Sequence, residues 1–264
     1  ILVKDKYQNK GLVKGKLFEK GFTNMVFDFD MSTDKLLLID TKQKDNENFY
    51  GRAIGKATMN LKGPESAAKM TLVAEANDSS HIYIPNSYSR ESGDADFIVF
   101  KEYGTEMVAE DSSSGFNLSV DLDIIANNKV QIDVIIDDLT GDVIKATGNG
   151  RLRIKAGSTE PLTMKGRYTI EKGSYDFNFQ SFIKKPFLLT GDGNNYIEWN
   201  GDPFLADLHI DARYIAENIN LGDLIGNQNY SFSDKMRGAR TDVIVVAELR
   251  DKLMQPSIQR SEER

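Results

Sequence analysis

The chain has 264 residues, a formal charge of −7, 40% hydrophobic residues and no cysteine. The acidic balance argues against a nucleic-acid-binding surface, which needs a basic face to neutralise phosphates, and no apolar run approaches the ~20 residues of a membrane-spanning helix. The lack of cysteine excludes disulfide frameworks, thiolate metal sites and thiol catalysis, whereas the apolar fraction is high enough for a folded core.

Alternating apolar and polar residues run through most of the chain. Because successive side chains of a strand point to opposite faces, this alternation predicts β-strands with one apolar face. Residues 70–76 form the first such run, residues 116–124 the clearest one, and residues 204–214 a third. Short turn-forming sequences separate the runs, and the pattern as a whole predicts an all-β fold.

The parity of the alternation changes at Gly173. The apolar residues before it are the even-numbered Tyr168 and Ile170, and those after it are the odd-numbered Tyr175, Phe177 and Phe179. A glycine at such a switch predicts a bulge or turn that returns the apolar side chains to the same face.

The division of the chain is predicted from its polar segments. Residues 91–114 are the most turn-like and predict a seam between a first part (1–110) and a second part (111–258), followed by a polar tail (259–264). Two short helices are expected, at 220–226 with Asn220 as the cap and at 233–237. The chain opens with Ile1 and without a signal peptide, so we expect it to be an internal piece of a longer protein.

Motifs for catalysis or metal binding are scarce. Asp207, His209 and Asp211 would share one strand face, where imidazole and carboxylates suit a divalent ion. We favour a solvated strand face, because no second cluster of ligands is evident. The second histidine, His81, has no partner nearby in the sequence. The many aspartates fall at polar strand positions or turns, which solubility explains as well as a glycosidase pair would. We therefore expect no enzyme activity, catalytic residue, metal or cofactor.

The apolar strand faces leave two architectures open. Two sheets can bury such faces against each other in a β-sandwich. Alternatively, the same residues can line an open groove that carries an apolar ligand.

A series of short motifs in fixed order covers residues 148–214. A Gly-x-Gly-x-Leu strand begins at Gly148, and a Gly-x-Tyr-x-Ile-x-x-Gly-x-Tyr-x-Phe pair begins at Gly166. An Ile-x-Trp-x-Gly-Asp-Pro turn begins at Ile197, and a Leu-x-Ile-x-Ala-x-Tyr strand begins at Leu208. This segment resembles the C-terminal domain of the TamB family, the translocation and assembly module proteins of the AsmA-like superfamily.

Two other parts of the chain support the resemblance. Similarity to family members from Bacteroidetes-like bacteria lies in residues 48–53 and 60–63, in Pro85 and in residues 97–100. Residues 243–258 resemble the family's next strand pair, with Asp251 where the family usually has glycine.

The resemblance implies a long sheet curled into a U-shaped trough, or β-taco, with a polar outside and an apolar inside. It implies a periplasmic protein that bridges the inner and outer membranes of a Gram-negative bacterium, with an inner-membrane anchor outside this chain. The implied function is phospholipid transport between the membranes and support of outer-membrane biogenesis and protein assembly. The implied partners are phospholipid and a BamA-like outer-membrane barrel of the TamA type.

Site residues are expected on two surfaces. The residues expected to line a lipid groove are Phe116, Leu118, Val120, Leu122, Ile124, Phe177, Phe179, Phe204, Leu208 and Ile210. Those expected at the edge that meets the barrel are Val243, Val245 and Leu249. Two other classes stay open: a structural or adhesive surface β-domain with a closed core, and an envelope carbohydrate-active enzyme with two convergent carboxylates.

Overall fold

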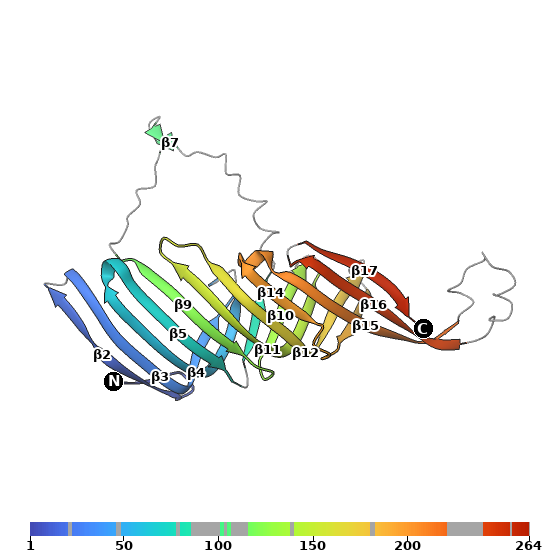
Figure 1. Ribbon diagram of the computed structural model, residues 1–264, viewed down its shortest axis with the longest axis horizontal. Coiled ribbons are helices and arrows are strands. Elements are labelled where there is room, and N and C mark those ends of the chain that lie inside the picture. Colours follow the sequence, from blue (N-terminus) through green and yellow to red (C-terminus); the bar gives the residue numbers. More distant parts are fainter. Residues whose placement is uncertain are drawn as a thin grey trace.

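The protein is a single large β-sheet in the computed structural model (Figure 1). The structure describes residues 1–20, 23–45, 49–77, 80–85, 101–102, 105–106, 116–137, 140–179, 183–220, 240–253 and 255–263. The sheet has 15 strands, and a separate pair of two-residue strands accompanies it. This confirms the predicted all-β fold.

Most strands of the large sheet follow one another along the chain with short connections; the longer ones precede β9 and β16. Those of the large sheet are β1 (Leu2–Lys4), β2 (Lys10–Lys20), β3 (Thr23–Thr41), β4 (Tyr50–Pro64), β5 (Ala68–Ala76), β6 (His81–Ile84), β9 (Leu118–Ala126), β10 (Gln131–Asp137), β11 (Asp142–Gly157), β12 (Thr163–Phe179), β13 (Ile183–Leu189), β14 (Tyr196–Gly201), β15 (Asp207–Asn220), β16 (Arg240–Lys252) and β17 (Gln255–Glu263). The small pair is β7 (Lys101–Glu102) and β8 (Thr105–Glu106), and the helical turns are η1 (Glu65–Ala67) and η3 (Pro203–Leu205).

Neighbouring strands are antiparallel at every junction but one. At that junction β9 lies parallel to β5, and β10 lies parallel to β6. The parallel junction joins the two sides of the predicted seam, so strands from residues 1–110 and from residues 111–258 form one continuous sheet.

Three pairs of short strands are the two halves of longer, interrupted strands. β5 and β6 both pair with β4, β9 and β10 both pair with β11, and β13 and β14 both pair with β12. Backbone hydrogen bonds continue across these interruptions. After β5, the Asn77 N–H donates to the Ile54 carbonyl of β4, and at the start of β10 the Gln131 N–H donates to the carbonyl of Ser80, just before β6.

The uninterrupted strands are irregular along the same row. The register shifts between Thr33 and Leu36 in β3 and between Thr147 and Gly148 in β11. Opposite the second shift β12 holds an extra residue, Glu171, just before Gly173, which confirms the predicted change of parity. We call this row of interruptions and bulges the fold line.

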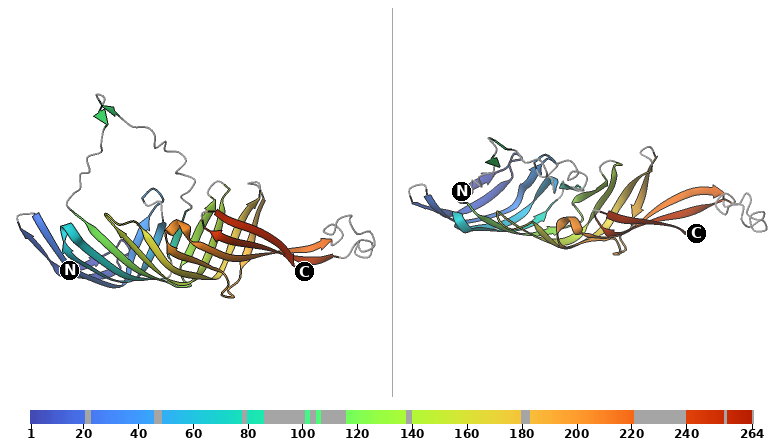
Figure 2. Two further views of the ribbon diagram at one scale, coloured as in Figure 1. Left: turned by 45° about the horizontal axis from the view of Figure 1, so that its top comes forward. Right: turned by 90° about the horizontal axis from the view of Figure 1, so that it is seen from above.

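The sheet curls at the fold line into a trough with two walls (Figure 2), since a bulge bends a strand and increases its twist. The first wall contains β5, β9, β14 and the parts of the longer strands that pair with them. The second wall contains β6, β10, β13 and the remaining parts of those strands. This arrangement is the predicted trough, made from one folded sheet rather than from two stacked sheets.

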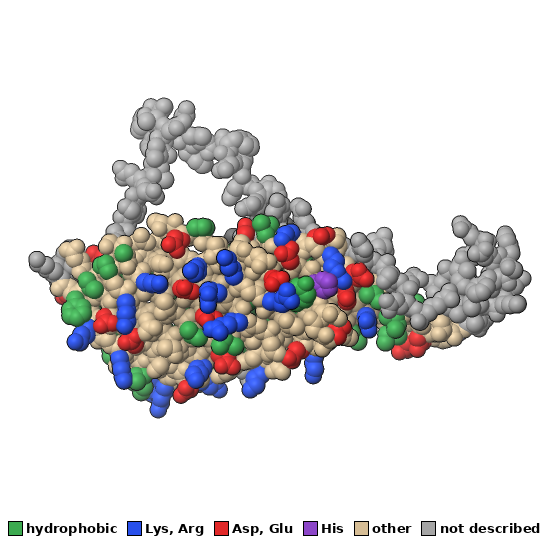
Figure 3. Space-filling view, viewed as in Figure 1, with side chains coloured by type: hydrophobic (Ala, Val, Ile, Leu, Met, Phe, Trp, Pro, Cys, Tyr) green, Lys and Arg blue, Asp and Glu red, His purple; other side chains and the backbone are tan. Residues whose placement is uncertain are grey.

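The two faces of the sheet differ in chemistry. In β11 the buried residues Ile144 and Leu152 alternate with Lys145 and Arg151, which face outward. Lys, Arg, Asp and Glu side chains are spread over the face of the sheet seen in Figure 3. The inner face holds the buried core, and the outer face keeps the molecule hydrated.

The C-terminal part departs from the expectations in three places. The predicted helix at 220–226 begins with Asn220, which is the last residue of β15, and its other residues lie outside the described part of the chain, as do residues 233–237. Residues 259–263, predicted as a polar tail, belong to β17. Asp251 has φ +68°, a left-handed conformation that glycine adopts at no steric cost, which explains the glycine usual in the similar family.

Candidate functional site, the inner face of the trough

Apolar residues of the inner face form a row that crosses seven strands. The register sets each member opposite the next: Val13, Met31, Met59, Leu72, Leu122, Ile154 and Met164. Directly opposed residues share one face of a sheet. The row therefore forms a continuous apolar stripe from β2 to β12.

A second row lies closer to the rim of the first wall. It consists of Phe29, Leu61, Met70, Val120 and Ala156, again each opposite the next. At the rim itself the rings of Phe27 and Phe116 meet edge to face, with their centroids 6.0 Å apart. The apolar surface thus extends to the rim.

A third row lies closer to the fold line, and its side chains change in size along the trough. It runs through Thr33, Ala57 and Ala74 and then through Ile124, Leu152, Gly166 and Trp199. Small side chains lie in β3–β5, whereas the large ring of Trp199 lies in β14.

Burial divides the inner face into two halves. In β2–β5 and β9, which we call the open half, the larger inner side chains such as Met31, Met59 and Leu122 are partly exposed. In β10–β16, which we call the packed half, Tyr168, Tyr175 and Ile210 are at most 1% exposed. The trough is therefore open to solvent along one half and filled by its own side chains along the other.

The predicted lining residues fall into both halves. Leu118, Val120, Leu122 and Ile124 share the inner face of β9 and are partly exposed, while Phe116 lies at the rim and is 41% exposed. By contrast, Leu208 and Ile210 belong to the packed core, so their prediction as an open lining is corrected. Phe177 is partly buried against that core, and the side chains of Phe179 and Phe204 lie outside the described residues.

The predicted partner edge is also corrected. Val243, Val245 and Leu249 belong to β16, which has β15 on one side. On its other side β17 pairs with β16 from Ile244 to Lys252, and β17 is the last strand of the sheet. Leu249 is completely buried. The C-terminal edge of the sheet is therefore β17.

The sequence analysis missed the inner residues of the first strands. Phe27, Phe29 and Met31 alternate with Asp28 and Asp30, which is the same signal that identified residues 116–124. Three methionines, at positions 31, 59 and 70, lie on this face, and their flexible side chains can adapt to ligands of different shape.

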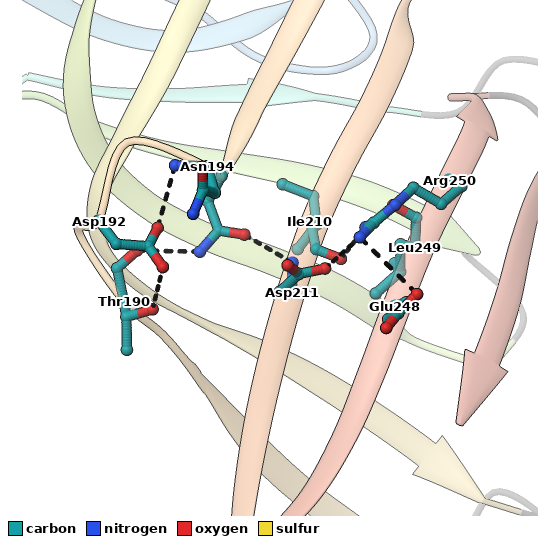
Figure 4. Close-up of polar contacts among 9 residues, drawn as sticks. Thr190, Asp192, Asn194, Ile210, Asp211, Glu248, Leu249 and Arg250 are labelled. Atoms are coloured by element: carbon teal, nitrogen blue, oxygen red, sulfur yellow. Dashed lines mark hydrogen bonds and ion pairs between the residues drawn. The ribbon is translucent and has the colours of Figure 1, made fainter. Parts of the chain in front are cut away.

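Polar side chains of the outer face are engaged with one another. Asp207 pairs with Lys252, and Asp211 pairs with Arg250, whose guanidinium also donates to the Ile210 carbonyl at 2.8 Å (Figure 4). His209 stacks on Tyr196 with ring centroids 5.0 Å apart. Hence Asp207 and Asp211, the two carboxylates of the possible metal site, both have cationic partners. The described residues contain no group of three or more His, Cys, Asp or Glu side chains arranged to hold a metal.

His81 also has a partner on the outer face. Its Nε2 atom lies 3.1 Å from Asp133 Oδ2, and its ring stacks on Tyr83. Since Asp133 is 52 positions away in the sequence, only the parallel pairing of β6 with β10 brings the two side chains together.

A buried asparagine side chain stabilises the connection between β13 and β14, which lies at the fold line. Asn195 is completely buried: its Nδ2 donates to the Thr190 carbonyl at 2.9 Å and its Oδ1 accepts from the Asp211 N–H at 2.6 Å. Beside it, Asp192 accepts a hydrogen bond from the Asn194 N–H, which lowers the pKa of the Asp192 carboxyl (Figure 4). The connection is thus fixed by hydrogen bonds of its own.

Comparison with known proteins identifies one family. The TamB C-terminal domain matches residues 2–263, which is nearly the whole chain and both sides of the predicted seam. No curated protein matches the sequence. Among the described residues, no helix is long and apolar enough to span a membrane.

Proposed function

The chain belongs to the TamB C-terminal domain family, and from this we propose that its trough shields phospholipid acyl chains during transport between the two membranes. A TamB-type protein is a component of the Gram-negative cell envelope. The proposed function includes support of outer-membrane biogenesis and protein assembly. The observation that carries the proposal is the apolar stripe from Val13 to Leu122, which stays partly exposed to solvent.

The physical basis is the cost of exposing alkyl chains to water. Each methylene kept from water is worth roughly 0.8 kcal/mol. Because the apolar rows continue from strand to strand, a chain that lies along them keeps its contacts as it moves. Charged headgroups remain in solvent at the open side of the trough, so no charged pocket is required.

The proposal includes no catalytic step and no cofactor. Outer-face carboxylates serve as cross-strand partners for cations: Lys145 donates to Asp176 at 2.7 Å, and Arg167 donates to Glu198 at 3.0 Å. These pairs hold neighbouring strands together on the hydrated side of the sheet and lie away from the apolar rows.

The proposed protein partner is a BamA-like outer-membrane barrel of the TamA type. An unpaired sheet edge can accept a strand from a partner, and among the described residues β17 has a neighbour on one side only. We therefore propose that the barrel binds at β17. An origin in Bacteroidetes-like bacteria stays a prediction.

Site-specific photo-crosslinking in cells tests the lipid proposal. Crosslinkers at positions 118, 120 and 122 face the trough, whereas those at 119, 121 and 123 lie on the opposite face of β9. We expect phospholipid to be captured by the first set and not by the second. Equal labelling of the two sets, or no labelling of either, contradicts the proposal.

The packed half favours one alternative function. Its buried core is what a structural or adhesive β-domain would have. That function predicts folded protein at the cell surface and no lipid at any of the six crosslinker positions.

A further inference from the structure

Resting on the proposed function, we infer that the acyl-chain site is confined to the open half, and that the packed half closes the trough at β11. A molecule with long alkyl chains would bind along β2–β5 and β9 and leave through the open side of the trough. It would not continue along the inner face toward β17.

Burial along the first row supports a boundary at β11. Met59, Leu72 and Leu122 are partly exposed, whereas the next residue of the row, Ile154, is 5% exposed. The contiguous cluster of buried core residues begins at Ala126, the last residue of β9, and has no buried member from the described strands β1–β5, where only Ala76 packs against it. An alkyl chain that lies along the first row would therefore meet side chains that are already packed at Ile154, and no exposed apolar surface.

Side chains of the third row become larger toward the packed half. Thr33, Ala57 and Ala74 leave room above the floor of the open half, because a small side chain fills little of the space between two walls. In β9 and β11 the same row carries Ile124 and Leu152, and after Gly166 in β12 it carries Trp199. Trp199 is 2% exposed and donates from Nε1 to the Pro203 carbonyl at 3.1 Å. The indole ring of Trp199 is thus held in place within the packed half.

Aromatic side chains pack against one another in the packed half. Tyr175, Phe187 and Tyr214 come from three strands, with ring centroids 6.4 and 5.7 Å apart along this chain of contacts. The Tyr175 hydroxyl donates to Asp142 Oδ2 at 3.2 Å. Opening this part for a ligand would require these rings to separate, whereas the open half requires no such change.

The open half is long enough for a complete lipid tail. From β2 to β11 there are five strand spacings, or about 24 Å at roughly 4.8 Å each. A single leaflet of the bilayer core is about 15 Å thick, half of the ~30 Å hydrocarbon layer. The tails of one phospholipid can therefore lie along the rows without entering the packed half.

Quenching of tryptophan fluorescence by brominated acyl chains tests the boundary. Trp199 is the only tryptophan of the sequence, so the wild-type chain reports on the packed half. A variant that combines Trp199→Phe with Leu122→Trp reports on the open half, and Met59→Trp replaces Leu122→Trp should the latter not fold. Trp199→Phe with Val73→Trp is the matched control, because Val73 lies on the outer face and is 47% exposed.

Vesicles of phosphatidylcholine with brominated acyl chains serve as the probe. We expect strong loss of fluorescence for Leu122→Trp and none for wild-type Trp199 or for Val73→Trp. Quenching of both Leu122→Trp and Trp199 would overturn the boundary and leave the proposed function standing. No quenching of Leu122→Trp, or equal quenching of Val73→Trp, would overturn the proposed function itself.

Discussion

Two tyrosines of β12 show how differently a buried hydroxyl can be accommodated. Tyr168 and Tyr175 are both almost completely buried on the inner face. The Tyr175 hydroxyl donates to Asp142, whereas within the described part of the chain the Tyr168 hydroxyl has no hydrogen-bond partner. Burial raises the pKa of the Tyr168 hydroxyl well above its usual value, so it stays neutral.

Removal of the two hydroxyls should have unequal effects on stability. Tyr175→Phe leaves the Asp142 carboxylate with one donor fewer and should lower the free energy of unfolding by about 1 kcal/mol. Tyr168→Phe removes an unsatisfied polar group and should leave that free energy unchanged or raise it. Urea titration followed by circular dichroism measures both, and a larger loss for Tyr168→Phe would contradict the assignment.

The ion pair between Asp123 and Arg151 makes stability depend on acid pH. Arg151 Nε donates to Asp123 Oδ1 at 2.7 Å, and this hydrogen bond lowers the pKa of Asp123 below its usual 3.8. A carboxyl with a lowered pKa in the folded state contributes stability above its unfolded pKa and loses it as the pH falls through the folded pKa.

Asp123→Asn should therefore weaken the dependence of stability on pH below about 4, since amide groups do not titrate there. Thermal unfolding of the wild type and the variant between neutral pH and pH 3 measures the difference. The wild type should be the more stable at neutral pH, and the two curves should converge in acid. Parallel curves would show that this pair contributes nothing.

At the scale of elements, β9 and β15 carry inner residues of the same chemical kind in different surroundings. Val120 in β9 is partly exposed, and Ile210 in β15 is completely buried. Their polar neighbours in sequence alternate identically, so the difference arises from what lies across the trough and not from the strand itself.

A carboxylate introduced at these two positions should have unequal effects. Val120→Asp can keep its water, so folding should survive while lipid capture at positions 118 and 122 is lost. Ile210→Asp buries an unpaired charge and should destabilise the fold by several kcal/mol. Circular dichroism and urea titration compare the variants, and unfolding of Val120→Asp would contradict an open trough.

At the scale of the whole molecule, the two edges of the sheet are unlike. At the N-terminal edge the short strand β1 pairs only with residues 10–12 of β2. The rest of β2 carries lysines at positions 14, 16 and 20, a feature that discourages unwanted strand pairing. The C-terminal edge strand β17 has no lysine, and only Pro256 near its start lacks a backbone N–H for strand pairing. The edge proposed to meet the barrel is therefore β17, with β2 protected by charge.

Cysteine crosslinking in the cysteine-free chain tests this polarity. Ser257→Cys lies in β17, and we expect disulfide crosslinks from it to single cysteines in the edge strand of an outer-membrane barrel. Lys16→Cys in β2 is the matched control and should give none. Crosslinks from Ser257→Cys to inner-membrane proteins alone would contradict the proposed partner.

Local pattern predicted the strands and the parity switch at Gly173, because alternation and bulges are recorded in neighbouring residues. The division into an open and a packed half was not predicted, since Val120 and Ile210 look alike in sequence. The His81–Asp133 contact and the fold line also escaped prediction, because both depend on strands that meet only through long-range pairing.

The parallel junction between β5 and β9 has a kinetic consequence. Most other neighbouring strands lie closer together in the chain, but β9 reaches β5 and β10 reaches β6 only after the chain between them has closed a long loop, which costs entropy before any ladder forms. We therefore expect two strand meanders, residues 1–84 and 118–263, to form independently during refolding. The two meanders would then dock in a slower step. Stopped-flow refolding should show tryptophan burial at Trp199 ahead of that step, and a single phase for both would contradict this order.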